Sequence, residues 1–169
     1  MYFIYSILTN LILLISPILL LIRILKGKED GKRFKEKFCL YSKKNSLNTI
    51  WFHAASVGEL MSIIPIIKKL ENLRSVKKII VTTSTTSSAK VFANFKFKKT
   101  IHKFFPLDTL FFSNRFIKFW KPQVAVFVDS EIWPNMFRNL KKKEIPIVII
   151  NARITKKSFN RWMRVRNFA

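Results

Sequence analysis

The chain has 169 residues, and its 32 Lys and Arg against 9 Asp and Glu give a formal net charge of +23. A hydrophobic content of 49% is too high for a disordered polycation, so we expect a packed core. The single cysteine, Cys39, excludes a disulfide framework and a cysteine-based zinc site, and two histidines are too few for a histidine-rich metal site. The charge favours anionic partners such as phospholipid or nucleic acid, although drift toward A+T-rich codons explains much of it equally well.

Residues 1–22 carry no charged side chain and are nearly all apolar, which predicts a transmembrane or deeply inserted helix at residues 2–25. A cleaved signal peptide is the alternative, but the basic start, shorter apolar core and small-residue cleavage site of such peptides are not present. Basic residues crowd the C-terminal flank: Arg23, Lys26, Lys28, Lys32, Arg33, Lys35 and Lys37. By the positive-inside rule, we expect a single-pass anchor (1–27), a basic juxtamembrane segment (28–48) against anionic headgroups, and a domain in the cytoplasm.

The rest of the chain alternates between β-rich apolar runs and helical patterns. Runs typical of buried strands lie at residues 49–53, 78–82, 124–128 and 145–150, with a weaker one at 101–105. Helical patterns lie between them at 59–70, 89–95, 114–120 and 132–142. This order predicts an α/β fold with a doubly wound, mostly parallel, Rossmann-like sheet over residues 49–155, and the start of a linker or basic helix at 156–169. Such sheets bind ligands at the carboxyl ends of their strands.

Acidic residues directly follow several of the predicted strands, at Glu59, Asp108, Asp129 and Glu131. Glu59 lies at a helix start three residues after Ser56, which is the spacing of a capping box, and Gly58 leaves room for a chain or ligand near the backbone. The same carboxylate is suited to accept a proton from an incoming hydroxyl group. These two interpretations of Glu59 compete, because a carboxylate held by its own cap is a poorer base.

Hydroxyl-bearing residues follow the second predicted strand. The run from Thr82 to Ser88, which includes Thr83 and Thr85, either caps the next helix or binds phosphate and sugar oxygens. After the third strand, we expect Asp108 to cap the helix that follows it.

The last two predicted strands also end in polar residues. The fourth ends in Asp129-Ser130-Glu131, and Trp133-Pro134-Asn135 follows at once, with Pro134 suited to the first turn of a helix. The fifth runs into Asn151 and Arg153, for which a surface ion pair is the alternative to a binding role.

Longer strings span these strand ends: His53-Ala54-Ala55-Ser56-Val57-Gly58-Glu59, Phe105-Pro106-Leu107-Asp108, Glu131-Ile132-Trp133-Pro134-Asn135 and Ile150-Asn151-Ala152-Arg153. In order, in spacing and in the preceding anchor, they resemble the N-terminal half of the 3-deoxy-D-manno-octulosonic acid (Kdo) transferases of lipopolysaccharide synthesis. Each string alone is weak evidence. Together and in register they extend the resemblance over essentially the whole chain.

The resemblance implies a metal-independent, cofactor-free glycosyltransferase of the two-domain GT-B type. Such an enzyme moves Kdo from CMP-Kdo onto a lipid A precursor at the cytoplasmic face of the bacterial inner membrane. The resemblance implies Glu59 as the general base and a functional role for Glu131. The residues that we expect to bind substrate are His53, Ser56, Gly58, Thr83, Thr85, Asp108, Asp129, Trp133, Asn135, Asn151 and Arg153.

The sequence departs from the family pattern in three respects. Ser87 and Ser88 stand where a glycine is common, and Asp129 stands where Glu is more frequent. The family's second domain, which binds the CMP-sugar, is not contained in these residues, so we expect a fragment or truncated product that is inactive alone.

Two other hypotheses stay open. One is another membrane-attached GT-B enzyme that acts on a lipid-linked acceptor, and the other is a non-catalytic membrane-anchored protein that binds anionic lipid. Nucleic acid is not expected as a partner, because no recognisable nucleic-acid-binding motif accompanies the charge.

Overall fold

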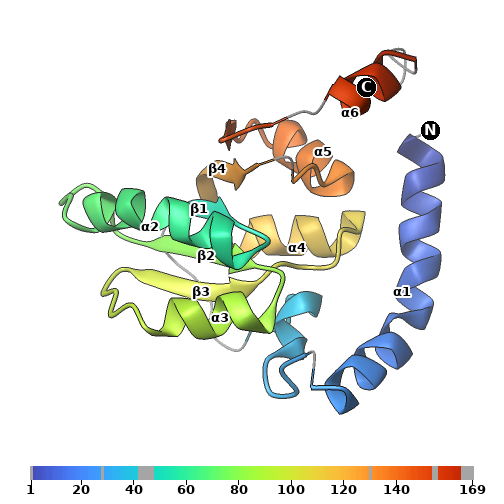
Figure 1. Cartoon of the computed structure of the whole chain (residues 1–169), viewed down its shortest axis with the longest axis horizontal. Coiled ribbons are helices and arrows are strands. Elements are labelled where there is room, and N and C mark those ends of the chain that lie inside the picture. The colour runs from blue at the N-terminus through green and yellow to red at the C-terminus, as the bar shows by residue number, and fades with distance from the viewer. Residues whose placement is uncertain (1, 28, 42–47, 130, 154–155, 165–169) are drawn as a thin grey trace.

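The computed structural model describes residues 2–27, 29–41, 48–129, 131–153 and 156–164. It has a layered α/β domain with a long N-terminal helix beside it (Figure 1). The strands are β1 (Thr49–His53), β2 (Ile79–Thr83), β3 (Thr100–Phe104), β4 (Pro122–Val128) and β5 (Ile147–Ile150). The helices are α1 (Tyr2–Leu25), the 3-10 helix η1 (Phe34–Phe38), α2 (Val57–Glu71), α3 (Thr86–Ala93), α4 (Leu110–Trp120), α5 (Pro134–Lys142) and α6 (Lys156–Arg164).

All neighbouring strands of the five-stranded sheet are parallel, in the order β3-β2-β1-β4-β5. The chain moves outward from β1 to β3 and then returns across the sheet to place β4 beside β1. In this register Phe52 of β1 lies between Val81 of β2 and Val126 of β4. The predicted doubly wound sheet is confirmed, and β1 and β4 meet where the strand order reverses.

The central strands β1 and β2 are buried on both faces, whereas the edge strand β5, expected to be buried, exposes Val148 and Ile149. One cluster of buried side chains lies between the sheet and helices α4 and α5, and it includes Trp51, Ile80, Phe116, Phe127 and Met136. The other lies between the sheet and helices α2 and α3, and it includes Phe52, Leu60, Ile63, Val81 and Phe92. Adjacent residues such as Trp51 and Phe52 point to opposite faces, as the pleat of a strand requires. This two-sided burial explains why the central strands are apolar along their length.

Capping residues decide where the helices begin. Helix α4 starts earlier than expected because the Thr109 side chain accepts a hydrogen bond from the Phe112 N–H. Helix α3 also starts earlier, because Thr85 accepts from the Ser88 N–H. Helix α5 begins at Pro134, which confirms the predicted place of this proline in the first turn.

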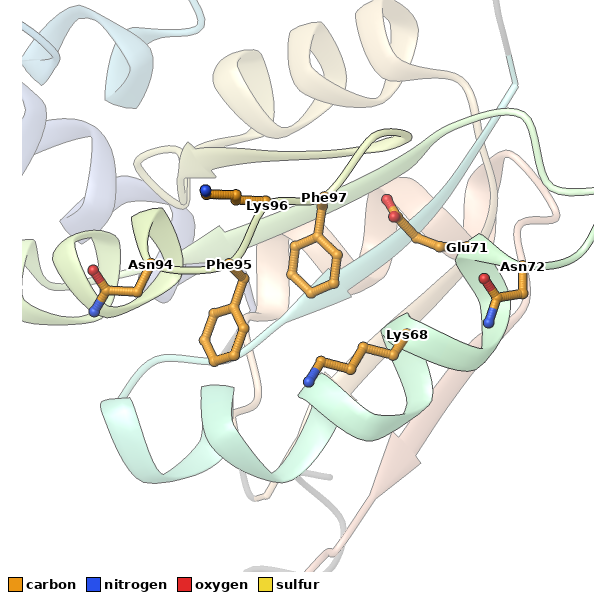
Figure 2. A pocket seen from close by; sticks show the side chains of 7 residues that line it. All are labelled: Lys68, Glu71, Asn72, Asn94, Phe95, Lys96 and Phe97. Carbon is orange, nitrogen blue, oxygen red and sulfur yellow. The ribbon is translucent and has the colours of Figure 1, made fainter.

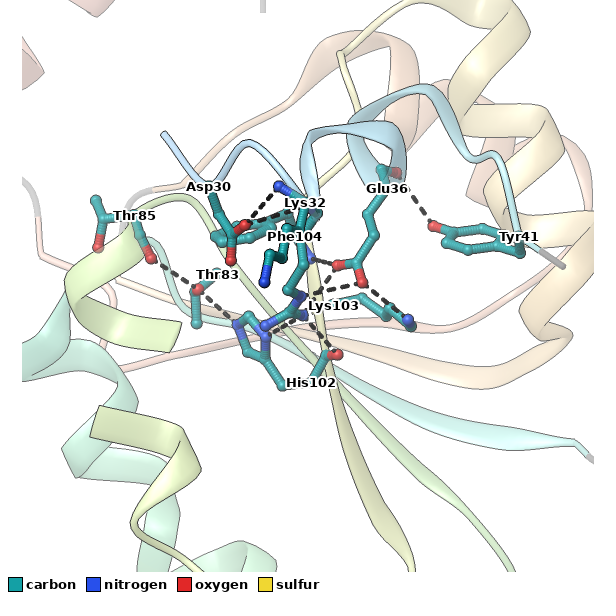
Figure 3. Close-up of polar contacts among 10 residues, drawn as sticks. Asp30, Lys32, Glu36, Tyr41, Thr83, Thr85, His102, Lys103 and Phe104 are labelled. Atoms are coloured by element: carbon teal, nitrogen blue, oxygen red, sulfur yellow. Dashed lines mark hydrogen bonds and ion pairs between the residues drawn. The ribbon is translucent and has the colours of Figure 1, made fainter. Parts of the chain in front are cut away.

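Helix η1 fastens the basic segment after α1 to the edge strand β3 (Figure 3). The Glu36 carboxylate accepts hydrogen bonds from the Phe104 N–H (2.9 Å), Lys103 Nζ (2.9 Å) and the Arg33 guanidinium (3.0 Å). Burial opposes ionisation of Glu36, but these donors outweigh it and lower its pKa below the ordinary value. The unpaired edge of β3 is thereby covered.

Helix α1 fits the predicted apolar anchor, since Tyr5–Leu25 is long and apolar enough to cross a membrane. In Figure 1, however, α1 runs alongside the α/β domain. The Tyr5 hydroxyl donates to the Asp108 carboxylate (2.8 Å), and the Asn135 amide donates to the Thr9 hydroxyl (3.2 Å). The N-terminal half of α1 therefore contacts the domain directly.

Candidate functional site

The carboxyl edge of the sheet gathers the acidic residues that follow β1 and β4. Glu59 lies in the first turn of α2, after β1, whereas Asp129 and Glu131 follow β4. Strands β1 and β4 are neighbours at the reversal of the strand order, which is where doubly wound sheets bind their ligands. We call Glu59, Asp129 and Glu131 the carboxylate cluster.

Glu59 is held by the start of its own helix. Ser56 Oγ donates to Glu59 Oε1 (2.7 Å) and accepts from the Glu59 backbone N–H (3.3 Å). The Ala55 N–H donates to Glu59 Oε2 (2.8 Å). The predicted capping role of Ser56 and Glu59 is therefore confirmed. Proton transfer by Glu59 remains a prediction.

His53, at the end of β1, is fully buried beside Glu131. Its Nδ1 lies 3.1 Å from the Thr82 carbonyl oxygen, which only accepts hydrogen bonds, so Nδ1 carries the proton. Burial lowers the pKa of His53 to about 3, and the ring is neutral at pH 7. Among the residues that the structure describes, Nε2 has no hydrogen-bond partner, and Glu131 Oε2 lies 3.9 Å from it. A lone pair of His53 thus lies next to the Glu131 carboxyl group.

Glu131 ionises less readily than an ordinary glutamate. Burial raises its pKa, and the carboxylates of Glu59 and Asp129 raise it further, against an opposing effect of Trp133. Once protonated, its O–H group is suited to donate to the Nε2 lone pair of His53. A carboxyl group whose pKa is raised, next to other carboxyl groups, is an arrangement that supports acid–base chemistry. Within the described ranges, no group of three or more His, Cys, Asp or Glu side chains is placed to hold a metal ion.

Aromatic rings form one wall of this region. The ring of Phe105, which follows β3, lies 4.0 Å from the His53 ring and 4.9 Å from the Trp133 ring, between centroids. The centroids of His53 and Trp133 are 6.2 Å apart. Trp133 comes directly before α5, so residues from three separate strand ends meet here. These rings exclude water from His53. They also contribute to the burial that lowers the pKa of His53 and raises the pKa of Glu131.

Asp108 and Asn135, predicted as substrate-binding residues, bind each other. Asp108 accepts hydrogen bonds from the backbone N–H groups of Asn135 (3.2 Å) and Met136 (2.8 Å), and the Asn135 amide donates to the Asp108 carbonyl oxygen (2.6 Å). The prediction that Asp108 caps the helix directly after it is wrong, because Thr109 occupies that position. Helices α4 and α5 pack side by side, which brings Asp108 to the start of α5 instead. Both side chains are buried.

The hydroxyl groups after β2 are also engaged within the protein. Thr83 Oγ1 lies 2.8 Å from His102 Nε2, and the Arg33 guanidinium lies 2.8 Å from His102 Nδ1 (Figure 3). Arginine only donates, so His102 accepts at Nδ1 and donates to Thr83 from Nε2. Thr85 caps α3 by accepting from the Ser88 N–H (3.1 Å). The capping interpretation of this loop is confirmed, and its binding of phosphate or sugar remains a prediction.

The remaining predicted site residues lie at the surface of the carboxyl edge. Gly58 is exposed, and a Cβ atom there would meet nothing within 4 Å, so packing does not require glycine. Asn151 and Arg153 are exposed after β5, next to β4. Asp129 and Asn151 adopt left-handed backbone conformations, with φ of 61° and 55°. Non-glycine residues in this conformation are uncommon and concentrate at turns and functional sites.

The sequence did not point to Tyr5 and Thr9, whose hydroxyl groups contact Asp108 and Asn135. The spacing of these two residues was the signal in the sequence that could have indicated a contact. Hydroxyl side chains four residues apart lie on one face of a helix, and here they interrupt an otherwise apolar surface.

A separate hollow of about 430 Å³ lies at the opposite edge of the sheet, between the C-terminal ends of α2 and α3 (Figure 2). The stacked rings of Phe95 and Phe97 line it, and Lys68 Nζ lies 5.6 Å from the Phe95 ring centroid. The Glu71 carboxylate there accepts from the Thr100 hydroxyl (2.7 Å) and so holds the start of β3. Because parallel sheets bind ligands at the other ends of their strands, we place the candidate site at the carboxylate cluster.

Comparison with known proteins shows which family the chain belongs to. The family model described as 3-Deoxy-D-manno-octulosonic-acid transferase (kdotransferase) matches residues 32–169. The chain belongs to the Kdo transferase family. The match includes η1, the whole sheet and every residue of the carboxylate cluster.

Relatives within the Kdo transferase family match nearly the whole chain. The 3-deoxy-D-manno-octulosonic acid transferase of Rickettsia bellii is 34% identical over 165 residues, which are 97% of this chain and 39% of that protein. The corresponding protein of Haemophilus influenzae is 32% identical over 164 residues, 94% of this chain and 38% of that protein. A probable mitochondrial 3-deoxy-D-manno-octulosonic acid transferase of Arabidopsis thaliana is 38% identical over 141 residues, 83% of this chain and 32% of that protein. The chain thus spans less than half the length of these Kdo transferases.

Proposed function

We propose that this chain is the acceptor-binding half of a GT-B glycosyltransferase that transfers Kdo from CMP-Kdo to a lipid A precursor in lipopolysaccharide core biosynthesis. The enzyme acts at the cytoplasmic face of the bacterial inner membrane and uses no cofactor. CMP-Kdo binds to a C-terminal domain outside these residues, so the isolated chain does not turn over. The observation that carries the proposal is the carboxylate cluster beside neutral His53, at the reversal of strand order.

In this proposal Glu59 is the general base. The acceptor hydroxyl takes the place of Ser56 as the donor to Glu59 Oε1 and transfers its proton to that oxygen. The acceptor oxygen then forms a bond to the anomeric carbon of Kdo while the bond from that carbon to CMP breaks, and CMP leaves from the opposite face. The Ala55 N–H keeps the carboxylate in place through Oε2 during this step.

Glu131 and His53 support the base without touching the transferred proton. Because its pKa is raised, Glu131 holds a proton more readily than an ordinary glutamate, and a protonated Glu131 does not repel the charge of Glu59. When Glu131 is protonated, a small approach of the two groups from their 3.9 Å separation lets its O–H donate to His53 Nε2, which then fixes the Glu131 carboxyl group. His53 is therefore a positioning residue.

The other predicted residues divide by exposure. Gly58, Asn151 and Arg153 are exposed and contact the acceptor, with Arg153 pairing with a phosphate group of the lipid A precursor. Ser56 and Thr85 are also exposed and cap the starts of α2 and α3. The residues that position the site from within are buried or half-buried: Thr83, Asp108, Asp129, Trp133 and Asn135.

Substitution of Glu59 in the complete enzyme tests the proposal. Glu59→Gln is expected to lower Kdo transfer by at least ~100-fold, the usual contribution of a general base. The free energy of unfolding should change by less than about 0.5 kcal/mol, because a glutamine side chain also completes a capping box. The measurements are a transfer assay with CMP-Kdo and a tetraacylated lipid A precursor, and denaturant unfolding.

Ser56→Ala is the matched control. It removes the capping hydroxyl and keeps the carboxylate, so we expect a loss of about 1 kcal/mol in stability with most of the transfer retained. Near-normal transfer by Glu59→Gln would exclude Glu59 as the base. Binding of anionic lipid by a complete enzyme that transfers no sugar would favour the non-catalytic alternative.

A further inference from the structure

One face of α1 is turned toward the protein along its described length. The least exposed side chains recur every three or four residues, which is the period of one helical face. They include Tyr5, Ser6, Thr9, Leu13, Ser16 and Leu20, and we call them the inner stripe. Among them Ser6, Ser16 and Leu20 are at most 8% exposed. The inner stripe also carries every hydroxyl-bearing side chain of α1 that the structure describes.

The N-terminal end of the inner stripe is bound to the carboxyl edge of the sheet. Tyr5 donates to Asp108 Oδ2 (2.8 Å), and Thr9 accepts from Asn135 Nδ2 (3.2 Å). Asn135 belongs to the same string as Glu131, four residues earlier in the chain. This end of α1 is therefore adjacent to the candidate site.

The C-terminal end of α1 is bound to the same body. Arg23 Nε pairs with Glu29 Oε1 (2.9 Å), and the same oxygen accepts from Lys37 Nζ of η1 (2.6 Å). Ile24 also packs on this segment, since its Cγ2 lies 3.3 Å from where a Cβ atom of Gly31 would be. Helix η1 in turn packs on β3. Both ends of α1 thus contact the α/β domain or the η1 segment that packs on it.

These contacts conflict with a helix that crosses a bilayer. Tyr5 and Arg23 are separated by about 27 Å along the helix axis, at ~1.5 Å per residue. A perpendicular helix would place them near opposite surfaces of a hydrocarbon core about 30 Å thick. The domain that both ends contact would then extend through the hydrocarbon core, where its polar and ionised groups are costly.

The opposite face of α1 is apolar and exposed. Its side chains include Leu11, Leu14, Ile18, Leu21 and Leu25, each at least 52% exposed. A continuous apolar surface of this size is unusual on a domain surrounded by water. Exposed Arg23, Lys26 and Lys32 lie at its C-terminal end and complement anionic headgroups.

We propose that α1 lies in the plane of an anionic membrane, with its apolar face among the acyl chains and its inner stripe against the α/β domain. This arrangement rests on the membrane attachment in the proposed function, but not on which sugar is transferred. Both ends of the helix then stay on the side of the bilayer that faces the domain. The contacts of Tyr5 and Thr9 bring the membrane surface next to the carboxylate cluster, where a lipid-linked acceptor has to arrive.

Spin labels at three positions test the orientation. Single Leu8→Cys, Ile15→Cys and Ile22→Cys variants place labels on the exposed face, seven residues apart, in vesicles of phosphatidylethanolamine and phosphatidylglycerol. The native Cys39 is 1% exposed, so it does not take up label. The depth of each label is measured by comparing how strongly lipid-soluble oxygen and a water-soluble nickel complex relax its spin. An exposed Lys96→Cys variant, on the distant loop after α3, serves as the aqueous control.

A helix in the plane gives the three labels the same shallow depth, within about 3 Å, which is well under one helical turn. A deep Ile15 label with Leu8 and Ile22 near opposite surfaces, in steps of ~10 Å, would overturn the proposal in favour of a crossing helix. Labels as aqueous as that at Lys96 would overturn membrane contact altogether. Kdo transfer by the complete enzyme is measured separately, so a failure of catalysis and a failure of this orientation are distinguishable.

Discussion

Glu131 lies where the fold disfavours its charge, because it is partly buried and faces Glu59 and Asp129. Its pKa is raised above the ordinary 4.5, so its contribution to stability is full below pH 4.5 and is lost as the pH rises through the folded-state pKa. We expect Glu131→Gln to raise the unfolding temperature at pH 7.5 but not at pH 4, and to reduce Kdo transfer in the complete enzyme. Thermal unfolding at the two pH values measures this.

The control for this prediction is Glu144→Gln, which removes the same charge from an exposed position outside the carboxylate cluster. It should leave the unfolding temperature nearly unchanged at both pH values. If Glu131→Gln destabilised the protein at pH 7.5, the raised pKa of Glu131 would be the wrong account of its environment.

Substitution of Gly58 distinguishes a role in substrate contact from a role in packing. A Cβ atom there meets nothing within 4 Å, and alanine favours a helix more than glycine does, so Gly58→Ala should stabilise the fold by about 0.5 kcal/mol. If the acceptor approaches the backbone at this turn, the same change lowers transfer through a higher acceptor KM. Denaturant unfolding and acceptor kinetics together measure this. Unchanged kinetics would remove Gly58 from the acceptor site.

At the scale of elements, η1 depends on Glu36. Its pKa is lowered, so the stability it contributes is full above pH 4.5 and is lost as the pH falls through the folded-state pKa. We expect Glu36→Gln to cost about 2 kcal/mol at pH 7, because a charged acceptor of several donors becomes neutral, and to cost little near pH 3. Denaturant unfolding at both pH values measures this. An equal cost at both would mean that charge is not what holds η1 on β3.

Most elements were predictable because their signals are local. The strands are short apolar runs, and β1 (Thr49–His53) lies where the sequence places it. The starts of α3 and α4 were less predictable, because each has several suitable caps nearby. Thr82, Thr83, Ser84 and Thr85 precede α3, and Asp108, Thr109 and Ser113 lie around the start of α4. Packing on the sheet selected Thr85 and Thr109 among them.

At the scale of the whole molecule, the basic residues behind the net charge of +23 lie both beside α1 and at the far edge of the domain. Lys26 and Lys32 are exposed beside the apolar face of α1. Each lysine near an anionic membrane contributes ~1 kcal/mol to binding, so a Lys26→Ala, Lys32→Ala double variant should bind phosphatidylglycerol vesicles about 30-fold more weakly at low salt. Vesicle sedimentation at two salt concentrations measures this. A Lys96→Ala, Lys98→Ala variant at the far edge is the control and should bind normally. Equal weakening by both pairs would mean that net charge alone, and not the face beside α1, attracts the membrane.

The sequence by itself determined the α/β class, the apolar N-terminal helix, the cap at Ser56 and the family strings, because each depends on residues close together in the chain. Only the tertiary structure decided that Asp108 caps α5, that His53 is neutral with a lone pair beside Glu131, and that Thr9 contacts Asn135 across 126 residues of sequence. Those outcomes depend on burial and on which distant segments the sheet order brings together. Protonation and capping at the site follow from this packing of distant segments, which the local sequence does not encode.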